Sequence, residues 1–282
     1  MTGNLLNGLV YGSLLFVLAS GLVLIYGLRR VVNFAHGSLY ALGAYIGLSI
    51  QHVAGFWVAL IVAPLVLAVS GYFLDRLVFR SLQRHPPEST LLVTYGLLLV
   101  IQDGIQTIWG KDSYVIRSPD LLSSNLELFG APFPIYRLSI IALALLVVLG
   151  LAMWLRSTRT GLFVRASSHD PVTTQIQGVN VNAVSGVVVA VGCALAGLAG
   201  VAAGPLISLS PEMGNQILVD SFVVVVLGGL GSLVGAFIAS IALGVLKTFG
   251  AIYVPGISSI VPFLVMSIVL MWRPTGFSGK RV

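Results

Sequence analysis

Charged residues are scarce in this chain. Only 9% of its 282 residues are Asp, Glu, Lys or Arg, whereas 57% are hydrophobic and the mean hydropathy is +1.02. A soluble domain carries roughly a quarter charged residues, so this composition excludes an ordinary soluble fold and indicates a chain that folds in a lipid bilayer. The single cysteine, Cys193, excludes an internal disulfide. Neither Lys nor Arg precedes Arg29, so we expect no signal peptide and interpret the first apolar run as a membrane helix.

Sequence patterns for catalysis, nucleotide binding and metal binding are absent as well. The chain has no Walker A sequence for ATP, no GxSxG elbow, and no HExxH or Cys/His cluster. No pair of acids lies within the apolar runs, as a proton-coupled pump would favour. The net charge of +6 is spread over the ends of these runs, which argues against nucleic acid as a partner. We therefore expect neither an enzyme nor a cofactor or metal bound by this chain.

Long apolar runs are what the chain has in abundance. A helix that crosses a bilayer needs about 20 mostly apolar residues, and the runs that qualify are 5–28, 36–53, 56–79, 89–109, 136–155, 181–203 and 257–272. A further stretch, 217–250, is too long for one crossing and is interrupted by GGLGS at 228–232. We expect a short helix, a break and a full helix there. The sequence thus predicts an all-α polytopic transmembrane helix bundle, organised as a single transmembrane domain over residues 1–282.

The basic residues predict how the bundle is oriented. Eleven of the 15 can lie on one side of the membrane: Arg29, Arg30, Arg76, Arg80, Arg84, Arg156, Arg159, Arg165, Arg273, Lys280 and Arg281. By the positive-inside rule that side is cytoplasmic, so the N-terminus is expected outside and the C-terminus inside. Opposite ends require an odd number of crossings. Counting 217–230 as a crossing gives nine, whereas a re-entrant segment there would give eight.

Two polar loops stand out by their length. Residues 110–135 form an outward loop, which is either a dock for a soluble partner or simply solvated. Residues 156–180 form an inward loop, in which Pro171 and Gly178 bound about two turns of predicted helix. Taken from the residues alone, the inward loop is either a solvated connector or an element that contacts a partner.

Two breaks interrupt the apolar runs, NFAHG at 33–37 and GGLGS at 228–232. Their similar surroundings suggest a weak internal repeat, and corresponding breaks in a transporter point to the permeation pathway. In one interpretation Asn33 and His36 satisfy backbone groups freed at the break, and Gly37 permits the sharp restart of the helix. In the other, these residues line the pathway or its inner gate, opposite Gly228, Gly229, Gly231 and Ser232. From the sequence we predict that a His36→Ala variant assembles but transports poorly, whereas loss of expression would favour the first interpretation.

Asp103 is the one acid well inside a run, and Asp220 lies in the stretch 217–250. Asp103 sits near the outer end of its run, where it either reaches interfacial water or lines a pathway. Asp220 opens the short segment at 217–230, and we interpret it as an N-terminal charge favoured by the helix dipole. On this view a pathway through the bundle is apolar and offers no clear counter-charge for a charged solute.

Four stretches resemble the permease subunit of bacterial branched-chain amino-acid ABC importers, the Liv type, and specifically its H-type subunit. They are YGLRRVVNFAHGSLYALGAY (26–45), GLFVRASSHDPVTTQIQGVNVNAV (161–184), VVLGGLGSLVGAFIASIALG (225–244) and RPTGFSGK (273–280). NFAHG matches the H-type signature. The second stretch follows the family pattern for the loop that couples to the ATPase, with Gly161, Arg165, Ala166, Asp170 and Gly178 at the matching positions. It departs from the pattern at Leu162 and Phe163, where the family often has Arg-Ala, and Arg159 could replace the missing basic contact.

The resemblance implies a multi-pass subunit of the bacterial inner membrane. Its implied partners are a second, M-type permease subunit, two ABC ATPase subunits that bind the ATP, membrane lipid, and a periplasmic or lipid-anchored solute-binding protein. Some relatives carry urea, short amides or aromatic acids, so these solutes stay open beside branched-chain amino acids, and so does a homodimeric pore. Two rival classes also stay open: a secondary transporter that works without ATPases, and a membrane assembly protein without a transport role.

Overall fold

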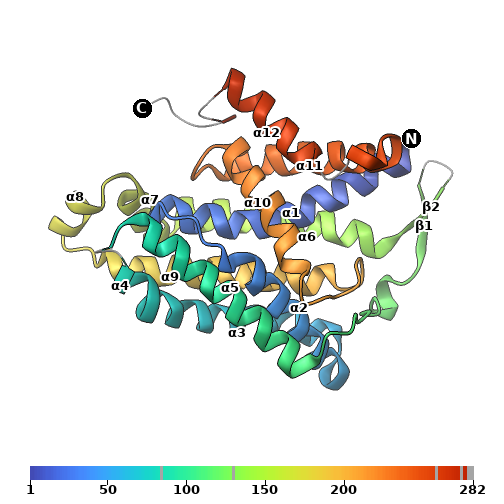
Figure 1. The fold of residues 1–282 in the computed structure, drawn as a ribbon, viewed down its shortest axis with the longest axis horizontal. Helices are drawn as coiled ribbons and strands as arrows, with labels where there is room; N and C mark the ends of the chain where they lie inside the picture. Colours follow the sequence, from blue (N-terminus) through green and yellow to red (C-terminus); the bar gives the residue numbers. More distant parts are fainter. Residues whose placement is uncertain (83–84, 129–130, 258–259, 274–275, 278–282) are drawn as a thin grey trace.

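The computed structural model describes residues 1–82, 85–128, 131–257, 260–273 and 276–277, and helices make up most of it (Figure 1). The long helices are α1 (Thr2–Arg29), α2 (Ala35–Ala54), α3 (Phe56–Leu74), α5 (Pro87–Trp109), α6 (Ile135–Ser157), α9 (Val181–Ala203), α10 (Met213–Gly228), α11 (Leu233–Tyr253) and α12 (Val261–Trp272). Each corresponds to a predicted run, so the expectation of an all-α bundle is confirmed. Most of the stretch at 273–280, and with it Lys280 and Arg281, lies outside the described residues, as does Arg84.

Shorter elements connect the long helices. They are the π-helical turn η1 (Asp75–Phe79), α4 (Arg80–Leu82), the 3-10 turns η2 (Asp120–Leu122) and η3 (Pro255–Ile257), the strands β1 (Asn125–Leu128) and β2 (Ala131–Pro134), and the helices α7 (Arg159–His169) and α8 (Pro171–Ile176). The two strands form an antiparallel hairpin within the outward loop, with Leu126 opposite Phe133. This hairpin was not predicted from the sequence. Pro132 and Pro134 lack backbone N–H donors and so favour an extended hairpin over a helix.

Helix α1 lies at the centre of the bundle. In its most apolar 18-residue window 89% of the residues are buried, against 72% for α9 and 17% for α5 and α6. Glycines allow its neighbours to come close: a Cβ on Gly12 would lie 2.7 Å from the carbonyl oxygen of Ser240 in α11, and one on Gly21 would lie 2.5 Å from that of Gly192 in α9. Small residues let helix backbones approach in this way, so α1 is held between α9 and α11.

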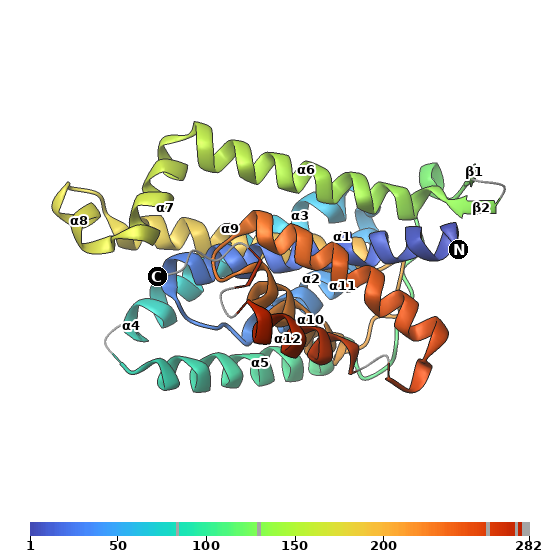
Figure 2. The same cartoon turned by 90° about the horizontal axis from the view of Figure 1, so that it is seen from above.

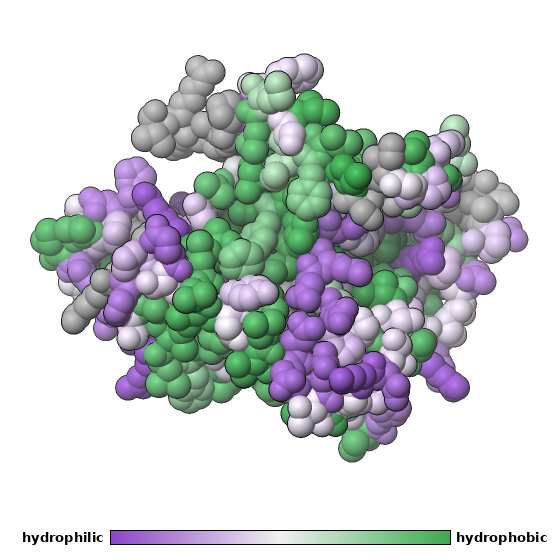
Figure 3. Space-filling model, in the orientation of Figure 1, coloured by the Kyte–Doolittle hydropathy of each residue, from purple (hydrophilic) through white to green (hydrophobic). Residues whose placement is uncertain are grey.

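The outer helices turn apolar side chains outward. Leu92, Val100, Leu146 and Met271 are 67–82% exposed, and Figure 3 shows a broad hydrophobic band between more polar ends. Within the described residues, six helices are long and apolar enough to cross a membrane. Helices α2, α10 and α12 are shorter or less apolar than these, so nine crossings stays a prediction. The chain is a multi-pass membrane protein by this pattern.

The bundle has two distinct ends, which we name by their elements. The basic end carries α4, α7, α8 and the end of α1, and the hairpin end carries the N-terminus and the β1–β2 hairpin (Figures 1 and 2). At the hairpin end Tyr114 and Leu209 form an isolated bridge, with backbone N–O distances of 3.0 and 2.8 Å. This bridge ties the outward loop to the connection between α9 and α10.

Candidate functional site

The NFAHG break follows a left-handed residue at the end of α1. Arg30 adopts φ +50°, and its backbone N–H donates to the Tyr26 carbonyl at 2.7 Å. Asn33 is 2% exposed, and its Oδ1 accepts a hydrogen bond from the backbone N–H of Ala35 at 3.0 Å. Asn33 therefore satisfies a backbone donor at the start of α2, as the structural interpretation of this residue requires.

His36 fastens the start of α2 to the middle of α1. Its ring is fully buried, and Nε2 lies 3.0 Å from the Leu18 carbonyl oxygen. Gly37 faces a different helix: a Cβ there would lie 2.4 Å from the carbonyl oxygen of Gly214 in α10. Both residues are thus packed between helices, which suits the structural interpretation better than a water-filled gate.

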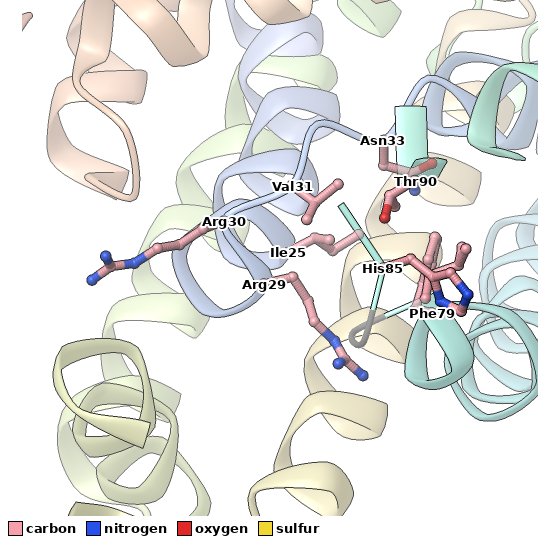
Figure 4. A pocket seen from close by; sticks show the side chains of 9 residues that line it. Ile25, Arg29, Arg30, Val31, Asn33, Phe79, His85 and Thr90 are labelled. Atoms are coloured by element: carbon pink, nitrogen blue, oxygen red, sulfur yellow. The ribbon is translucent and has the colours of Figure 1, made fainter. Parts of the chain in front are cut away.

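Asn33 borders a cavity of about 280 Å³ at the basic end (Figure 4). Its lining residues are Ile25, Arg29, Arg30, Val31, Asn33, Phe79, Leu82, His85 and Thr90. Figure 4 shows Asn33 beside Thr90, whereas the Arg30 side chain points away from the other labelled residues. Of the three NFAHG candidates, Asn33 is the one that lines this cavity.

The GGLGS break is a tight turn between α10 and α11. Gly229 and Gly231 adopt φ values of +94° and +89°, which L side chains rarely adopt. The Ser232 hydroxyl accepts a hydrogen bond from Gly235 N at 3.1 Å and so starts α11. A Cβ on Gly235 would lie 1.8 Å from the Gly228 carbonyl oxygen, so glycine is required where the two helices meet.

The two breaks have different neighbours. The GGLGS turn lies at the end of α1, where a Cβ on Gly231 would be 3.4 Å from the Gly27 Cα. On its other side Phe277 N donates to the Leu227 carbonyl at 2.7 Å. His36 and Gly37 instead contact the middle of α1 and the start of α10. A shared gate formed by both breaks stays a prediction that these contacts do not support.

The inward segment 156–180 folds into two helices, α7 and α8, where the sequence analysis predicted one. The Thr158 hydroxyl accepts a hydrogen bond from Gly161 N at 3.0 Å, which starts α7. Gly161 packs against the end of α6, where a Cβ would lie 2.2 Å from the Trp154 carbonyl oxygen. Gly161 therefore allows the start of α7 to lie close against the backbone at the end of α6.

Asp170 and Gly178 bound α8. Asp170 Oδ1 accepts from the backbone N–H groups of Val172 and Thr173, both at 3.0 Å, and Oδ2 accepts from the Thr173 hydroxyl at 2.5 Å. These bonds, led by that of the Thr173 hydroxyl, lower the pKa of the Asp170 carboxyl. Gly178 adopts φ +86° and ends the element, as predicted. Asp170 is thus a helix cap, which fixes α8 as a short rigid unit.

The surface of α7 and α8 combines a basic residue with exposed apolar side chains. These helices project from the basic end in Figures 1 and 2. Arg165 is exposed and Ala166 is half-buried. Val172 and Ile176 are 66% and 80% exposed, and Figure 3 shows apolar atoms at the tip where α8 lies. Arginine and exposed apolar groups together are typical of a protein contact surface.

A buried ion cluster lies at the basic end and was not predicted. Asp75 is fully buried in η1 and pairs with Arg29 through Oδ1 and with Arg80 through Oδ2 at 3.1 Å. The Ser185 hydroxyl donates to Oδ1 at 3.0 Å, and Arg80 also donates to the Asn182 carbonyl at 2.9 Å. The cluster joins the end of α1 and the turn after α3 to the start of α9. Both arginines were counted only as positive-inside charges in the sequence analysis.

A second ion pair joins α10 to α11. Lys247 Nζ pairs with Asp220 Oδ2, and the Tyr11 hydroxyl donates to the same oxygen at 2.5 Å. The interpretation of Asp220 as an N-terminal charge was wrong, because α10 begins at Met213 and places Asp220 two turns inside the helix. The ion pair itself was not predicted. A signal was present: an acid and a base stand alone in neighbouring apolar runs, where each needs a partner.

Comparisons with known proteins agree with this geometry. Residues 4–270 match the family described as "Branched-chain amino acid transport system / permease component". The high-affinity branched-chain amino acid transport system permease protein BraD of Pseudomonas aeruginosa is 29% identical over 294 residues, which cover 98% of this chain and 95% of BraD. LivH of Escherichia coli K12, which carries the same description, is 26% identical over 296 residues, covering 98% and 95%. The ribose import permease protein RbsC of the same strain is 25% identical over 289 residues, covering 95% and 83%.

One solved structure has a similar fold. PsaBC from Streptococcus pneumoniae in complex with Fab matches with a TM-score of 0.50 and 14% identity, over 94% of this chain and 89% of that one. At this identity the likeness concerns the fold alone. The family match, by contrast, runs almost from end to end and confirms the resemblance drawn from the four sequence stretches. The chain therefore belongs to the permease component family of branched-chain amino acid transport systems.

Proposed function

We propose that this chain is a permease subunit of an ABC importer in the bacterial inner membrane and that the importer carries branched-chain amino acids. The observation that carries the proposal is the family match over residues 4–270. It is supported by BraD and LivH, which are described as permease proteins of high-affinity branched-chain amino acid transport systems and match this chain over nearly its full length. The subunit itself catalyses no reaction in this proposal, and ATP is hydrolysed by partner subunits.

The α7–α8 surface is the proposed contact with an ATPase subunit. It projects from the basic end, carries the exposed Arg165, and presents Val172 and Ile176 to solvent. The Asp170 cap holds α8 as a rigid unit, which suits an element that moves with an ATPase. Because α7 follows directly on α6, and α9 follows α8, a displacement of this surface would reach two long helices.

The proposed arrangement in the membrane places the basic end in the cytoplasm. Nine crossings, an outer N-terminus and an inner C-terminus follow from the distribution of basic residues. The hairpin end then faces the solute-binding protein, and the outward loop 110–135 is its candidate dock. A second permease, of the M type or a second copy of this chain, completes the pore in this proposal.

A sugar is the second candidate solute, because RbsC, a ribose import permease, is also related over most of its length. The other solutes considered from the sequence, namely urea, short amides and aromatic acids, have no such observation in their favour. Competition experiments separate the two candidates. If the importer carries branched-chain amino acids, excess valine or isoleucine suppresses leucine uptake and excess ribose has no effect on it.

The partners are tested by purifying the tagged chain from its native membrane in mild detergent and identifying the co-purified proteins by mass spectrometry. We expect ABC ATPase subunits and a permease subunit. Ile176→Asp, which places a charge on the α8 surface, should lose the ATPases and keep the permease. Leu121→Asp is the matched control, since Leu121 is 78% exposed at the opposite end. A chain that purifies alone, or an Ile176→Asp variant that retains its ATPases, would contradict the proposal.

A further inference from the structure

A large open cavity lies at the hairpin end, away from the breaks and from α7–α8. Its volume is about 690 Å³, which is in the range of sites for small molecules. Residues of α1, α2, α10 and α11 line it, together with the connection between α9 and α10. In the proposed orientation this end faces outward, where a solute would enter the permease.

The Asp220–Lys247 ion pair lies in the wall of this cavity. Lys247, Tyr11 and Tyr40 line the cavity, and Asp220 is bonded to the first two. The Asp220 side chain is only 4% exposed, whereas that of Lys247 is 30% exposed. Lys247 Nζ also lies 3.1 Å from the Tyr11 hydroxyl and 5.1 Å from the centre of its ring. The buried Asp220 carboxylate is thus paired with an ammonium group that lines the cavity and is partly exposed.

Tyr40 supplies an independent indication of a ligand. Its side chain is fully buried and borders the cavity, yet its hydroxyl has no hydrogen-bond partner within the described part of the chain. A buried hydroxyl without a partner is unfavourable, because it has lost its hydrogen bonds to water. Its donor is therefore available to an acceptor group that enters the cavity, such as a carboxylate.

The rest of the lining is mixed. Apolar side chains come from Ile207, Met213, Ile217 and Ile252. These can contact an aliphatic side chain of a bound solute, whereas the charged groups lie on α10 and α11. The cavity therefore combines apolar side chains with the Lys247 ammonium group, which covers the Asp220 carboxylate, and with several hydroxyl and amide groups, of which the Tyr40 hydroxyl has no partner within the described part of the chain.

We propose that this cavity is the entry site for the amino-acid solute, an inference that rests on the proposed function. The ammonium group of the zwitterion lies beside Asp220, its carboxylate accepts from Lys247 and Tyr40, and its side chain contacts the apolar wall. The internal ion pair opens, and each partner acquires an opposite charge from the solute, so no charge is left unpaired. An aromatic acid or a neutral amide would leave at least one of the two charges without its counterpart, and a sugar would leave both.

The rival interpretation is that the ion pair only holds α10 against α11. A charge swap distinguishes a solute site from such a structural pair, because Asp220→Lys combined with Lys247→Asp rebuilds an internal pair but inverts the positions of the charges. A zwitterion that enters with its aliphatic group against the same wall would then meet like charges. A purely structural pair would tolerate the swap.

The test uses the purified complex in liposomes with its solute-binding protein, and measures uptake of labelled leucine and ATP hydrolysis together. We expect Lys247→Gln and the swapped variant to lower leucine uptake per ATP by about tenfold, which corresponds to about 1.4 kcal/mol, and Tyr40→Phe to lower it by about threefold. Glu88→Gln, which removes an exposed charge at the start of α5, outside both the cavity and the outward loop, should leave the ratio unchanged.

Wild-type transport by the swapped variant, or by both Lys247→Gln and Tyr40→Phe, would overturn the inference. So would a Lys247→Gln complex that fails to assemble while the swapped complex assembles and transports normally, because that result describes a structural pair. If the wild-type complex shows no ATP-driven leucine uptake, the proposed function fails and the inference falls with it. These results are distinguishable because the wild-type measurement comes first.

Discussion

Two buried carboxylates, one at each end of the bundle, are paired in different ways. Asp75 is fully buried, and two arginines and a serine surround it. Asp220 is almost as buried, but its partner Lys247 is 30% exposed and lines an open cavity. The first arrangement is closed, so its charges serve to hold α1, η1 and α9 together. The second can exchange partners with a solute. Burial of an acid in a membrane protein therefore does not by itself reveal its role, and the accessibility of its partner is more informative.

The largest effect is expected from breaking the closed cluster. Asp75→Asn leaves Arg29, whose side chain is 8% exposed, without its counter-charge, and removal of one partner of a buried pair costs about 3–5 kcal/mol. We expect a large drop in the thermal unfolding temperature and in the yield of assembled complex. Asp103→Asn is the control, because Asp103 is exposed. An Asp75→Asn complex as stable as wild type would remove the basis for calling this cluster a clamp.

The second largest loss of stability is expected from a change at the buried His36. His36→Ala removes a fully buried ring and its contact with the Leu18 carbonyl, and leaves a cavity. We expect a loss of about 2–3 kcal/mol, read as a lower unfolding temperature. His52→Ala serves as the control, since His52 is exposed on the same helix. A stable and assembled His36→Ala complex with impaired transport would instead support the gate interpretation of NFAHG.

Asp220→Asn should cost less stability than either change. Lys247 can turn to water in the cavity once its partner is neutral, and the Tyr11 hydroxyl can still donate to the amide oxygen. We expect about 1–2 kcal/mol, with Asp112→Asn as the control, from the unfolding temperatures of the purified complexes. A loss equal to that of Asp75→Asn would mean that both carboxylates are clamps, and the contrast between the two ends would be gone.

Loss of the exposed Asp170 cap should have the smallest effect on stability, and that effect should be confined to α8. The pKa of Asp170 is lowered chiefly by the Thr173 hydroxyl, so its cap is complete above the ordinary value of about 3.9 and is lost as the pH falls through the lowered folded value. The backbone amides of Val172 and Thr173 should be protected from hydrogen exchange at neutral pH and should lose that protection in acid. Asp170→Ala should remove it at all pH values, and Gln175→Ala should not. Equal protection in Asp170→Ala would show that the cap does not hold α8.

Much of the fold follows from the sequence because membrane helices obey a simple rule of length and polarity. The predicted runs 5–28 and 181–203 became α1 and α9 within a few residues. The break at 228–232 and the end of α8 at Gly178 were also predicted, since glycine is the residue that tolerates positive φ. These features are local, and the residues that cause them lie next to one another.

The ion clusters could not be predicted in the same way. Asp220 and Lys247 are 27 residues apart and meet because the GGLGS turn folds α11 back along α10. Asp75 meets Arg29 and Ser185 through three different parts of the chain. Positive-inside counting treats every arginine as a solvated charge, so it also obscured the buried partners of Asp75. Apolar patterns reveal which segments are helical, whereas contacts between helices depend on their packing.

ATP-dependent accumulation of labelled leucine tests the central claim most directly. The complex purified through this chain is placed in liposomes with its solute-binding protein, and ATP is supplied on the side of α7 and α8. The account predicts that leucine accumulates on that side against its gradient, that valine and isoleucine compete, and that accumulation stops without ATP. Leucine flux that does not depend on ATP, or that an ion gradient drives, would contradict it.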